Sequence, residues 1–158
     1  MTSPEKSIDG EPLSKQRLRL WLKMLKASSQ IEMELRKRLR DEFGSTLPRF
    51  DVMSALARYP DGLKMSEISG LLRVSNGNVT GIVDRLTKEG LALRVSVPGD
   101  RRAHRVRLTP EGQTAFTELA IAHEGWLSSI LEGIDQNDID LLGGALDRLN
   151  TSLPGKDD

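Results

Sequence analysis

The 158-residue sequence contains no cysteine, two histidines and six aromatic residues. The lack of cysteine excludes disulfides, thiolate zinc sites and thiol-based redox sensing. Because His104 and His123 fall in different predicted elements, we expect no metal site. The sequence also lacks an apolar run of about 18 residues, and it does not open with a basic and then apolar leader. We therefore expect a cytoplasmic protein that has no membrane partner.

Motifs of the common enzyme classes are missing too. The sequence has no nucleophile elbow, no phosphate-binding loop, no zinc-binding helix motif and no dinucleotide fingerprint. We therefore predict that the chain is not an enzyme and needs no cofactor.

The formal net charge is zero, but the charges are segregated along the chain. Residues 11–112 carry 20 Lys and Arg against 12 Asp and Glu, whereas residues 113–158 carry 2 against 9. Such segregation suits a protein whose basic part meets phosphates while its acidic part does something else. An uneven solvated surface is the alternative.

A long helix is predicted from Leu13 to Phe43, because no proline or glycine interrupts it. One face carries Trp21, Met24, Ser28, Ile31, Leu35 and Leu39 at steps of three and four residues. A helix of about 30 residues is roughly 45 Å long, more than so small a domain covers by itself. We expect this helix to pack against a partner chain.

The following elements are predicted from turn and cap residues. A helix follows Leu47-Pro48, a short extended piece spans Leu63 to Met65, and Ser66 caps a further helix. Val74 bridges to the next helix, which Ser75 caps and Gly90 ends. Leu91, Leu93, Val95 and Val97 then alternate with Ala92, Arg94 and Ser96, which indicates a hairpin strand with a turn at Pro98-Gly99-Asp100. Thr109 and Pro110 begin another helix, and Asp135 begins the last one.

This order predicts a mainly α protein with a small β-hairpin wing, a winged helix-turn-helix with N- and C-terminal dimerisation helices. We expect a flexible lead-in at residues 1–12 and a flexible tail at 152–158. The DNA-binding lobe is expected at 46–109, and the helical dimerisation region at 13–45 and 110–151.

The second helix of a helix-turn-helix enters the major groove. Opposite its apolar stripe lie Gly77, Gly81, Asp84 and Lys88, flanked by Asn78, Thr80 and Arg85. A glycine costs a helix about 1 kcal/mol relative to alanine, so an exposed pair indicates that something approaches closely. Ser75 and Asn76 offer short polar groups to bases or phosphates, unless they only cap the helix. Arg85 is the best candidate for a bidentate contact with guanine.

The hairpin tip carries Asp100, Arg101 and Arg102. Arginine at such a tip suits a narrow minor groove, where the negative potential is deepest. We expect Asp100 to orient Arg102 through a charge-assisted hydrogen bond. Arg94 and Arg105 are expected on the hairpin face away from the core, where they could contact the DNA backbone. A solvated charge cluster is the alternative.

The stretches SNGNVTGIVDRLTKEGL and GDRRAHRVRLTPEG resemble the recognition helix and wing of the MarR family of bacterial regulators. The similarity in layout extends to about Leu149. It implies a homodimer whose terminal helices interlock, with Arg102 in the minor groove and Asp100 holding it. It also implies a palindromic double-stranded operator, read by recognition helices about 34–36 Å apart.

Members of this family are usually released from DNA by a small aromatic or amphipathic anion. Trp21, Phe43, Phe50, His123 and Trp126 are candidates for contacting it, or else belong to the core or an interface. The stretches LPRFDVM and SNGNVTG resemble relatives that control aromatic-acid breakdown, some of which answer to a coenzyme A thioester. Arg36, Arg38, Arg40 and Arg49 could meet its phosphates, or form a solvated face.

The rival interpretation is a winged-helix module that binds proteins without sequence-specific DNA binding. The glycine face and the two arginines of the tip argue against it. We therefore expect a ligand-responsive, DNA-binding transcriptional regulator that acts as a repressor.

Overall fold

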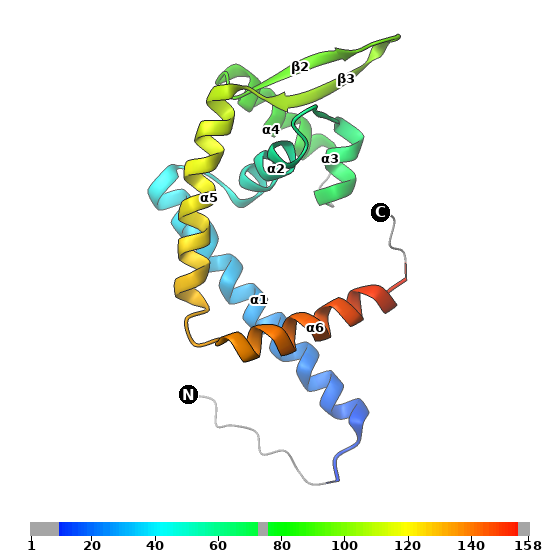
Figure 1. The fold of residues 1–158 in the computed structure, drawn as a ribbon, viewed down its shortest axis with the longest axis vertical. Helices are drawn as coiled ribbons and strands as arrows, with labels where there is room; N and C mark the ends of the chain where they lie inside the picture. The colour runs from blue at the N-terminus through cyan, green and yellow to red at the C-terminus, as the bar shows by residue number, and fades with distance from the viewer. Residues whose placement is uncertain (1–9, 73–75, 155–158) are drawn as a thin grey trace. The chain divides into compact units, whose positions relative to one another are not determined.

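The computed structural model describes residues 10–72 and 76–154, and it leaves the side chains of Asn76, Arg101 and Arg102 undescribed. These residues form two compact units that divide between Leu119 and Ala120, within α5 (Pro110–Ile130). Each unit is described by itself. The first contains α1 (Leu13–Phe43), α2 (Leu47–Arg58), α3 (Met65–Leu72), α4 (Asn76–Lys88) and a three-stranded sheet (Figure 1).

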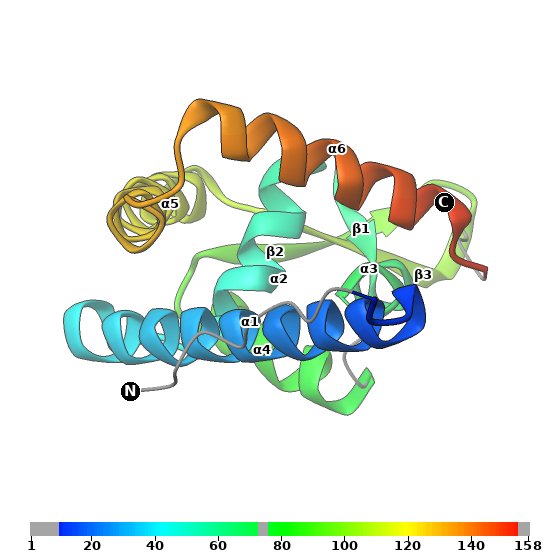
Figure 2. The ribbon, with the colours of Figure 1, turned by 90° about the horizontal axis from the view of Figure 1, so that it is seen from below.

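The long first helix is confirmed with both predicted ends, and it runs as one continuous helix (Figure 2). It ends where Gly44 takes a left-handed conformation with φ of 59°, which glycine adopts without steric cost. The N–H groups of Gly44 and Ser45 donate to the carbonyls of Arg40 and Leu39, at 3.0 and 3.1 Å. The following α2 begins at Leu47 itself, because the Thr46 hydroxyl accepts from the Arg49 N–H at 3.3 Å.

The prediction that Ser66 caps the third helix is wrong. Since α3 begins at Met65, Ser66 lies inside its first turn. The Glu67 carboxylate instead accepts from the Lys64 N–H at 2.9 Å, which satisfies a backbone donor at this helix end. The predicted bridge at Val74 and cap at Ser75 lie outside the described residues.

The fourth helix ends as predicted at Gly90, whose φ is 75°. The Gly90 N–H donates to the Thr87 carbonyl at 3.1 Å and the Leu91 N–H to the Leu86 carbonyl at 2.9 Å, the bonds of a Schellman motif. The core of this unit lies between α2, α3, α4 and the sheet. Its fully buried side chains include Val52, Met53, Leu56, Ile68, Val79, Val83, Leu86 and Val106.

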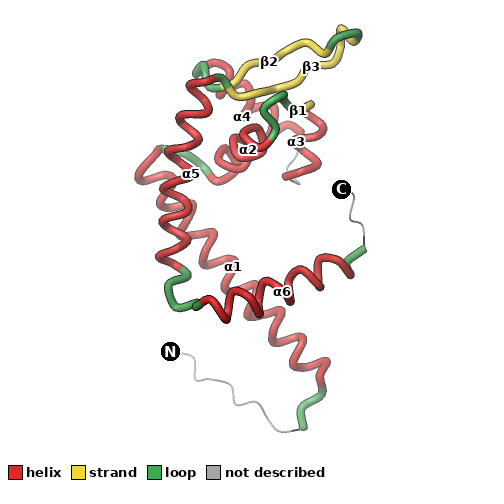
Figure 3. Tube along the Cα trace, viewed as in Figure 1, coloured by secondary structure: helices red, strands yellow, loops and turns green. Residues whose placement is uncertain are grey.

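The sheet is antiparallel, with β1 (Leu63–Lys64) beside β3 (Asp100–Leu108), and β3 beside β2 (Ala92–Val97) (Figure 3). The predicted extended piece is therefore a third strand of the wing. In the register, Ala92 pairs with Leu108, and Arg94 pairs with Val106. Directly paired residues share one face of a sheet. Arg94 thus lies on the face of buried Val106 and Leu108.

This register corrects the predicted faces of the hairpin. Arg105 pairs with Val95, so it lies on the opposite face from Arg94 and not on the same one. Ala92 is buried, whereas Leu93 and Val95 are only half-buried. The inward position at the start of β2 is therefore occupied by a small residue, Ala92, and farther along the same face Arg94 forms an ion pair with Asp84 of α4.

The second unit consists of the last part of α5 and the whole of α6 (Gln136–Ser152). As predicted, Asp135 begins the last helix, as the N-cap of a capping box with Asp138, with N–H to carboxylate distances of 2.9 and 3.2 Å. The helix buries none of its residues. Large apolar side chains nevertheless stand exposed along it, at Ile139, Leu141, Leu142, Leu146 and Leu149.

Within the described part of the chain, no helix is long and apolar enough to cross a membrane. The same residues hold no group of three or more histidine, aspartate or glutamate side chains that could bind a metal ion.

Candidate nucleic-acid interface

The fourth helix presents one buried and one open face. Val79, Val83 and Leu86 are fully buried and fix the orientation of the helix. The open face exposes Gly77, Asn78, Thr80, Gly81, Arg85 and Lys88. A Cβ atom added at Gly77 or Gly81 would meet nothing within 4 Å, so this surface is smooth because nothing in the subunit fills it. A bulky partner can therefore approach the helix backbone closely here.

Asp84 and Arg94, both predicted to contact DNA, contact one another. Arg94 Nη2 of β2 donates to Asp84 Oδ1 of α4 at 2.5 Å, and both side chains remain partly exposed. The pair links the recognition helix to the wing. It also neutralises a carboxylate that would otherwise repel a phosphate backbone.

The wing tip combines a tight turn with a bulge. Pro98 and Gly99 turn the chain, and Gly99 has φ of 84°, the value required at the third position of a type II turn. Ser96 pairs with His104 but Val97 pairs with Asp100. The pairing therefore moves by four residues along β3 while it moves by one residue along β2. The backbone of Arg101 and Arg102 lies within this register shift. The predicted contact from Asp100 to Arg102 lies outside the described side chains and stays a prediction.

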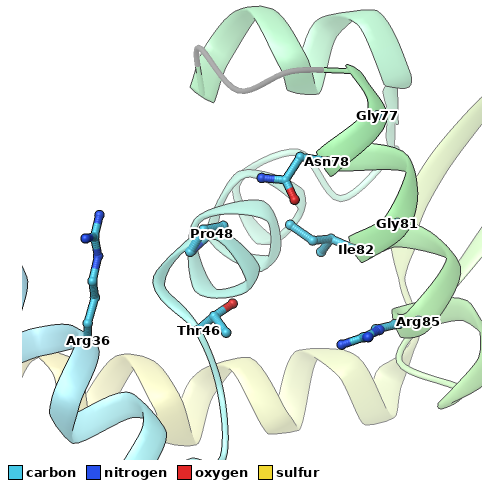
Figure 4. Close-up of a pocket in the computed structure, with 8 residues that line it drawn as sticks. All are labelled: Arg36, Thr46, Pro48, Gly77, Asn78, Gly81, Ile82 and Arg85. Atoms are coloured by element: carbon cyan, nitrogen blue, oxygen red, sulfur yellow. The ribbon is translucent and has the colours of Figure 1, made fainter.

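Among the residues that the structure describes, the fourth helix lines at least two hollows of the first unit. The larger, about 550 Å³, is lined by Arg36, Thr46, Pro48, Gly77, Asn78, Gly81, Ile82 and Arg85 (Figure 4). The smaller, about 290 Å³, is lined by Phe43, Gly44, Ser45, Thr46, Arg49, Ile82, Arg85 and Glu89. They share Thr46, Ile82 and Arg85. Both hollows therefore touch the helix that presents the glycine face.

The candidate ligand residues do not all meet at these hollows. Arg36 lines the larger one, and Phe43 and Arg49 line the smaller one. Phe50 is instead a core residue, whose ring centroid lies 5.8 Å from that of Phe116. Trp21 is 52% exposed and lines neither hollow.

The remaining two candidates, His123 and Trp126, belong to the second unit. Sequence reasoning missed Ser45 and Ile82, which line the smaller hollow. Ser45 follows the end of the first helix and Ile82 lies on the apolar stripe of the fourth, so the sequence indicated only a structural role for each.

The comparisons with known proteins agree on one family. The MarR family model matches residues 43–103, which include α2, α4 and the wing tip. A crystal structure of a MarR family transcriptional regulator from Silicibacter pomeroyi is 35% identical, with a TM-score of 0.75; the match covers 90% of this chain and 98% of that one. The uncharacterised HTH-type transcriptional regulator YsmB of Bacillus subtilis is 25% identical, over 85% of this chain and 91% of its own.

The same fold occurs in a solved protein–DNA complex. Sco3205, a MarR family transcriptional regulator from Streptomyces coelicolor, was crystallised with DNA and matches with a TM-score of 0.77 at 21% identity, over 94% of this chain and 95% of that one. At this identity the likeness concerns the fold.

Proposed function

The chain belongs to the MarR family of DNA-binding transcriptional regulators, which are not enzymes, and on this basis we propose that two copies of it read a palindromic operator. The recognition helix α4 enters the major groove with its glycine face, and the wing tip enters the neighbouring minor groove. The observation that carries this proposal is the open, side-chain-poor surface at Gly77 and Gly81. The DNA complex of Sco3205 supports it, because that protein shares the fold.

The remaining contacts follow from the chemistry of the open face. Asn78 and Thr80, with Ser75 and Asn76 at the helix start, supply short polar groups for bases and phosphates. Arg85 has the reach for a bidentate contact with guanine, worth about 1–3 kcal/mol of discrimination. At the tip, Arg101 and Arg102 meet the narrow minor groove, where Asp100 orients Arg102.

The dimer is supported by the apolar surface of the terminal helices. Leu18, Leu20, Trp21 and Leu22 of α1 are at least half exposed, as are Ile139, Leu141 and Leu142 of α6. An apolar surface this extensive marks a protein interface in a folded chain. We assign residues 13–45 and 110–151 to dimerisation and 46–109 to DNA binding. The acidic segment 113–158 then belongs to the dimer region, while the basic middle of the chain faces DNA.

We further propose that a small aromatic acid, or its coenzyme A thioester, releases the dimer from DNA and that the protein is a repressor. The hollows beside α4 support this, because a small anion bound there would meet arginine side chains next to the DNA-reading face. On this proposal the regulator is one of those that control aromatic-acid breakdown.

The test is filter binding of operator DNA across a range of salt concentrations, with Arg102→Ala as the variant. We expect operator affinity to fall steeply as salt rises, because each phosphate contact releases about one counterion. Arg102→Ala should abolish operator binding at physiological salt while the dimer stays intact by sedimentation. A winged-helix module that binds only proteins would show no steep salt dependence, and an Arg102→Ala protein that still protects the operator would refute the wing contact.

A further inference from the structure

Three charged side chains line the smaller hollow, two arginines and one glutamate. Arg49 belongs to the first turn of α2, Arg85 belongs to the last turn of α4, and Glu89 follows α4 directly. A single carboxylate therefore has two arginines beside it as candidate partners.

The structure gives the carboxylate to Arg49. Arg49 Nη2 lies 2.5 Å from Glu89 Oε2, and the side chains are 23% and 50% exposed. The Arg49 charge is mostly shielded from water, so it gains more from a partner than an exposed cation does. Among the residues that the structure describes, no carboxylate forms an ion pair with Arg85, which is exposed.

Arg85 is nevertheless the nearer cation along the chain. The Glu89 N–H donates to the Arg85 carbonyl at 2.9 Å, so the two residues lie one helical turn apart. Opposite charges at this spacing share one face of a helix and attract each other. Figure 4 shows the Arg85 side chain extending from α4 toward Thr46, the N-cap of the helix that carries Arg49. Without Arg49, the Glu89 carboxylate would pair with Arg85.

The two paired charges stand at the unfavourable ends of their own helices. Arg49 lies in the first turn of α2, where the helix dipole disfavours a cation, and its N–H donates to the Thr46 cap at 3.3 Å. Glu89 lies at the C-terminal end of α4, where the dipole disfavours an anion. Neither charge stabilises the helix that carries it, so the role of the pair lies between the helices.

We infer that Arg49 is a positioning residue for the operator contact of Arg85. By holding the Glu89 carboxylate, Arg49 leaves the Arg85 guanidinium available to a base edge. The inference rests on the proposed function in one respect, since Arg85 is the arginine assigned there to guanine. An Arg85 paired with Glu89 has to break that pair when the operator binds. Binding through phosphates alone does not need this base contact, so the loss falls on sequence discrimination.

The experiment measures discrimination, the ratio of operator affinity to affinity for a random duplex of equal length, by filter binding of the full chain at low salt. We expect Arg49→Gln to lower this ratio about two- to fivefold, the factor for breaking one exposed ion pair. Glu89→Gln alone should keep the wild-type ratio, and adding Glu89→Gln to Arg49→Gln should restore it. Arg58→Gln is the matched control and should keep the ratio. Arg58 ends the same helix and, in the described part of the chain, pairs with no carboxylate.

A pair that only ties α2 to α4 gives a different pattern. Arg49→Gln, Glu89→Gln and the double variant would then lower the ratio alike, because each of them removes the tie. That pattern overturns the inference, as does an Arg49→Gln protein with the wild-type ratio.

NMR of the arginine side chains, recorded without DNA, tests the exchange of partners independently. We expect the Arg85 Nε–H signal to shift in Arg49→Gln and to shift back when Glu89→Gln is added. An Arg85 signal that is the same in wild type and Arg49→Gln overturns the inference. A chain that shows the exchange of partners but binds no operator keeps the effect of Arg49 on Arg85 and refutes the proposed DNA-binding function.

Discussion

At the scale of residues, we propose that Arg94 acts on DNA through a neighbouring side chain, Asp84. It pairs with Asp84 of the recognition helix at 2.5 Å, on the face of the wing that turns toward the core. Asp84 alone would repel phosphates, and the paired arginine removes that repulsion. Exposed ion pairs contribute about 0–1 kcal/mol to stability, so the effect of this pair on folding is small.

The pair is tested by a double-mutant cycle in operator binding, with Asp84→Ala, Arg94→Ala and both together. We expect Arg94→Ala to weaken binding and the added Asp84→Ala to restore part of it, a coupling of about 0.5–3 kcal/mol for neighbours in one network. Arg107→Ala is the control, because Arg107 pairs with Leu93 on the other wing face. Additive losses would mean that Arg94 contacts phosphate by itself.

Single residues also show what the sequence could predict. The helix ends at Gly44 and Gly90 and the cap at Thr109 are local features, and each was confirmed. In the predicted apolar stripe of α4, Val79, Val83 and Leu86 are buried, whereas Ile82 is only half-buried. The face of Arg94 was predicted wrongly, because it depends on pairing with a strand farther along the chain. The sequence could not predict that the buried Ser45 hydroxyl has no hydrogen-bond partner among the described residues, because this depends on how several elements pack around it.

At the scale of elements, one junction joins the recognition helix, the wing and α5. The Thr109 hydroxyl donates to the Gly90 carbonyl at 2.7 Å and accepts from the Gly112 N–H at 3.0 Å. The Thr109 N–H donates to the Leu91 carbonyl at 3.0 Å. A Cβ on Gly112 would lie 1.9 Å from that carbonyl oxygen, so only glycine fits. The junction explains the residues LTPEG at 108–112, the end of the stretch that resembles the wing of the MarR family.

Gly112→Ala should therefore destabilise the protein, although alanine normally favours a helix. Overpacking typically costs about 1–3 kcal/mol, and here the contact is with backbone that cannot give way easily. The midpoint of urea unfolding should fall accordingly. Gly70→Ala is the control, since a Cβ there meets nothing within 4 Å in the middle of α3, and it should raise stability by up to about 1 kcal/mol. A Gly112→Ala protein as stable as wild type would contradict the close approach.

At the scale of the whole molecule, the apolar terminal helices imply that the functional unit is larger than one chain. Both helices were predicted from the sequence by periodicity, and the length of the first led to the expectation of a partner. The partner itself lies beyond a single chain, so the interlocking of two subunits stays a prediction.

Leu142→Glu should separate the dimer, because a charge would be placed in an apolar interface. Thr151→Glu is the matched control, since Thr151 lies on the opposite side of α6, nine residues and half a turn away in phase. Sedimentation should show monomers for the first variant and dimers for the second. The monomeric variant should also lose about half of the salt dependence of operator binding, because it contacts one half-site. A dimeric Leu142→Glu protein would exclude this helix from the interface.

The claim on which the molecule's function depends is that DNA lies against the glycine face of α4. Gly81→Leu tests it most directly, with urea unfolding and operator affinity measured on the same protein. Gly125→Ala is the control, because Gly125 is a helical glycine that does not belong to this face. Since a Cβ at Gly81 meets nothing within the subunit, leucine should raise the free energy of unfolding by roughly 0.8 kcal/mol. Operator affinity should fall by at least about tenfold, or 1.4 kcal/mol, because the side chain occupies the space of the groove wall. A Gly81→Leu protein that is more stable and binds the operator as tightly as wild type would contradict the claim.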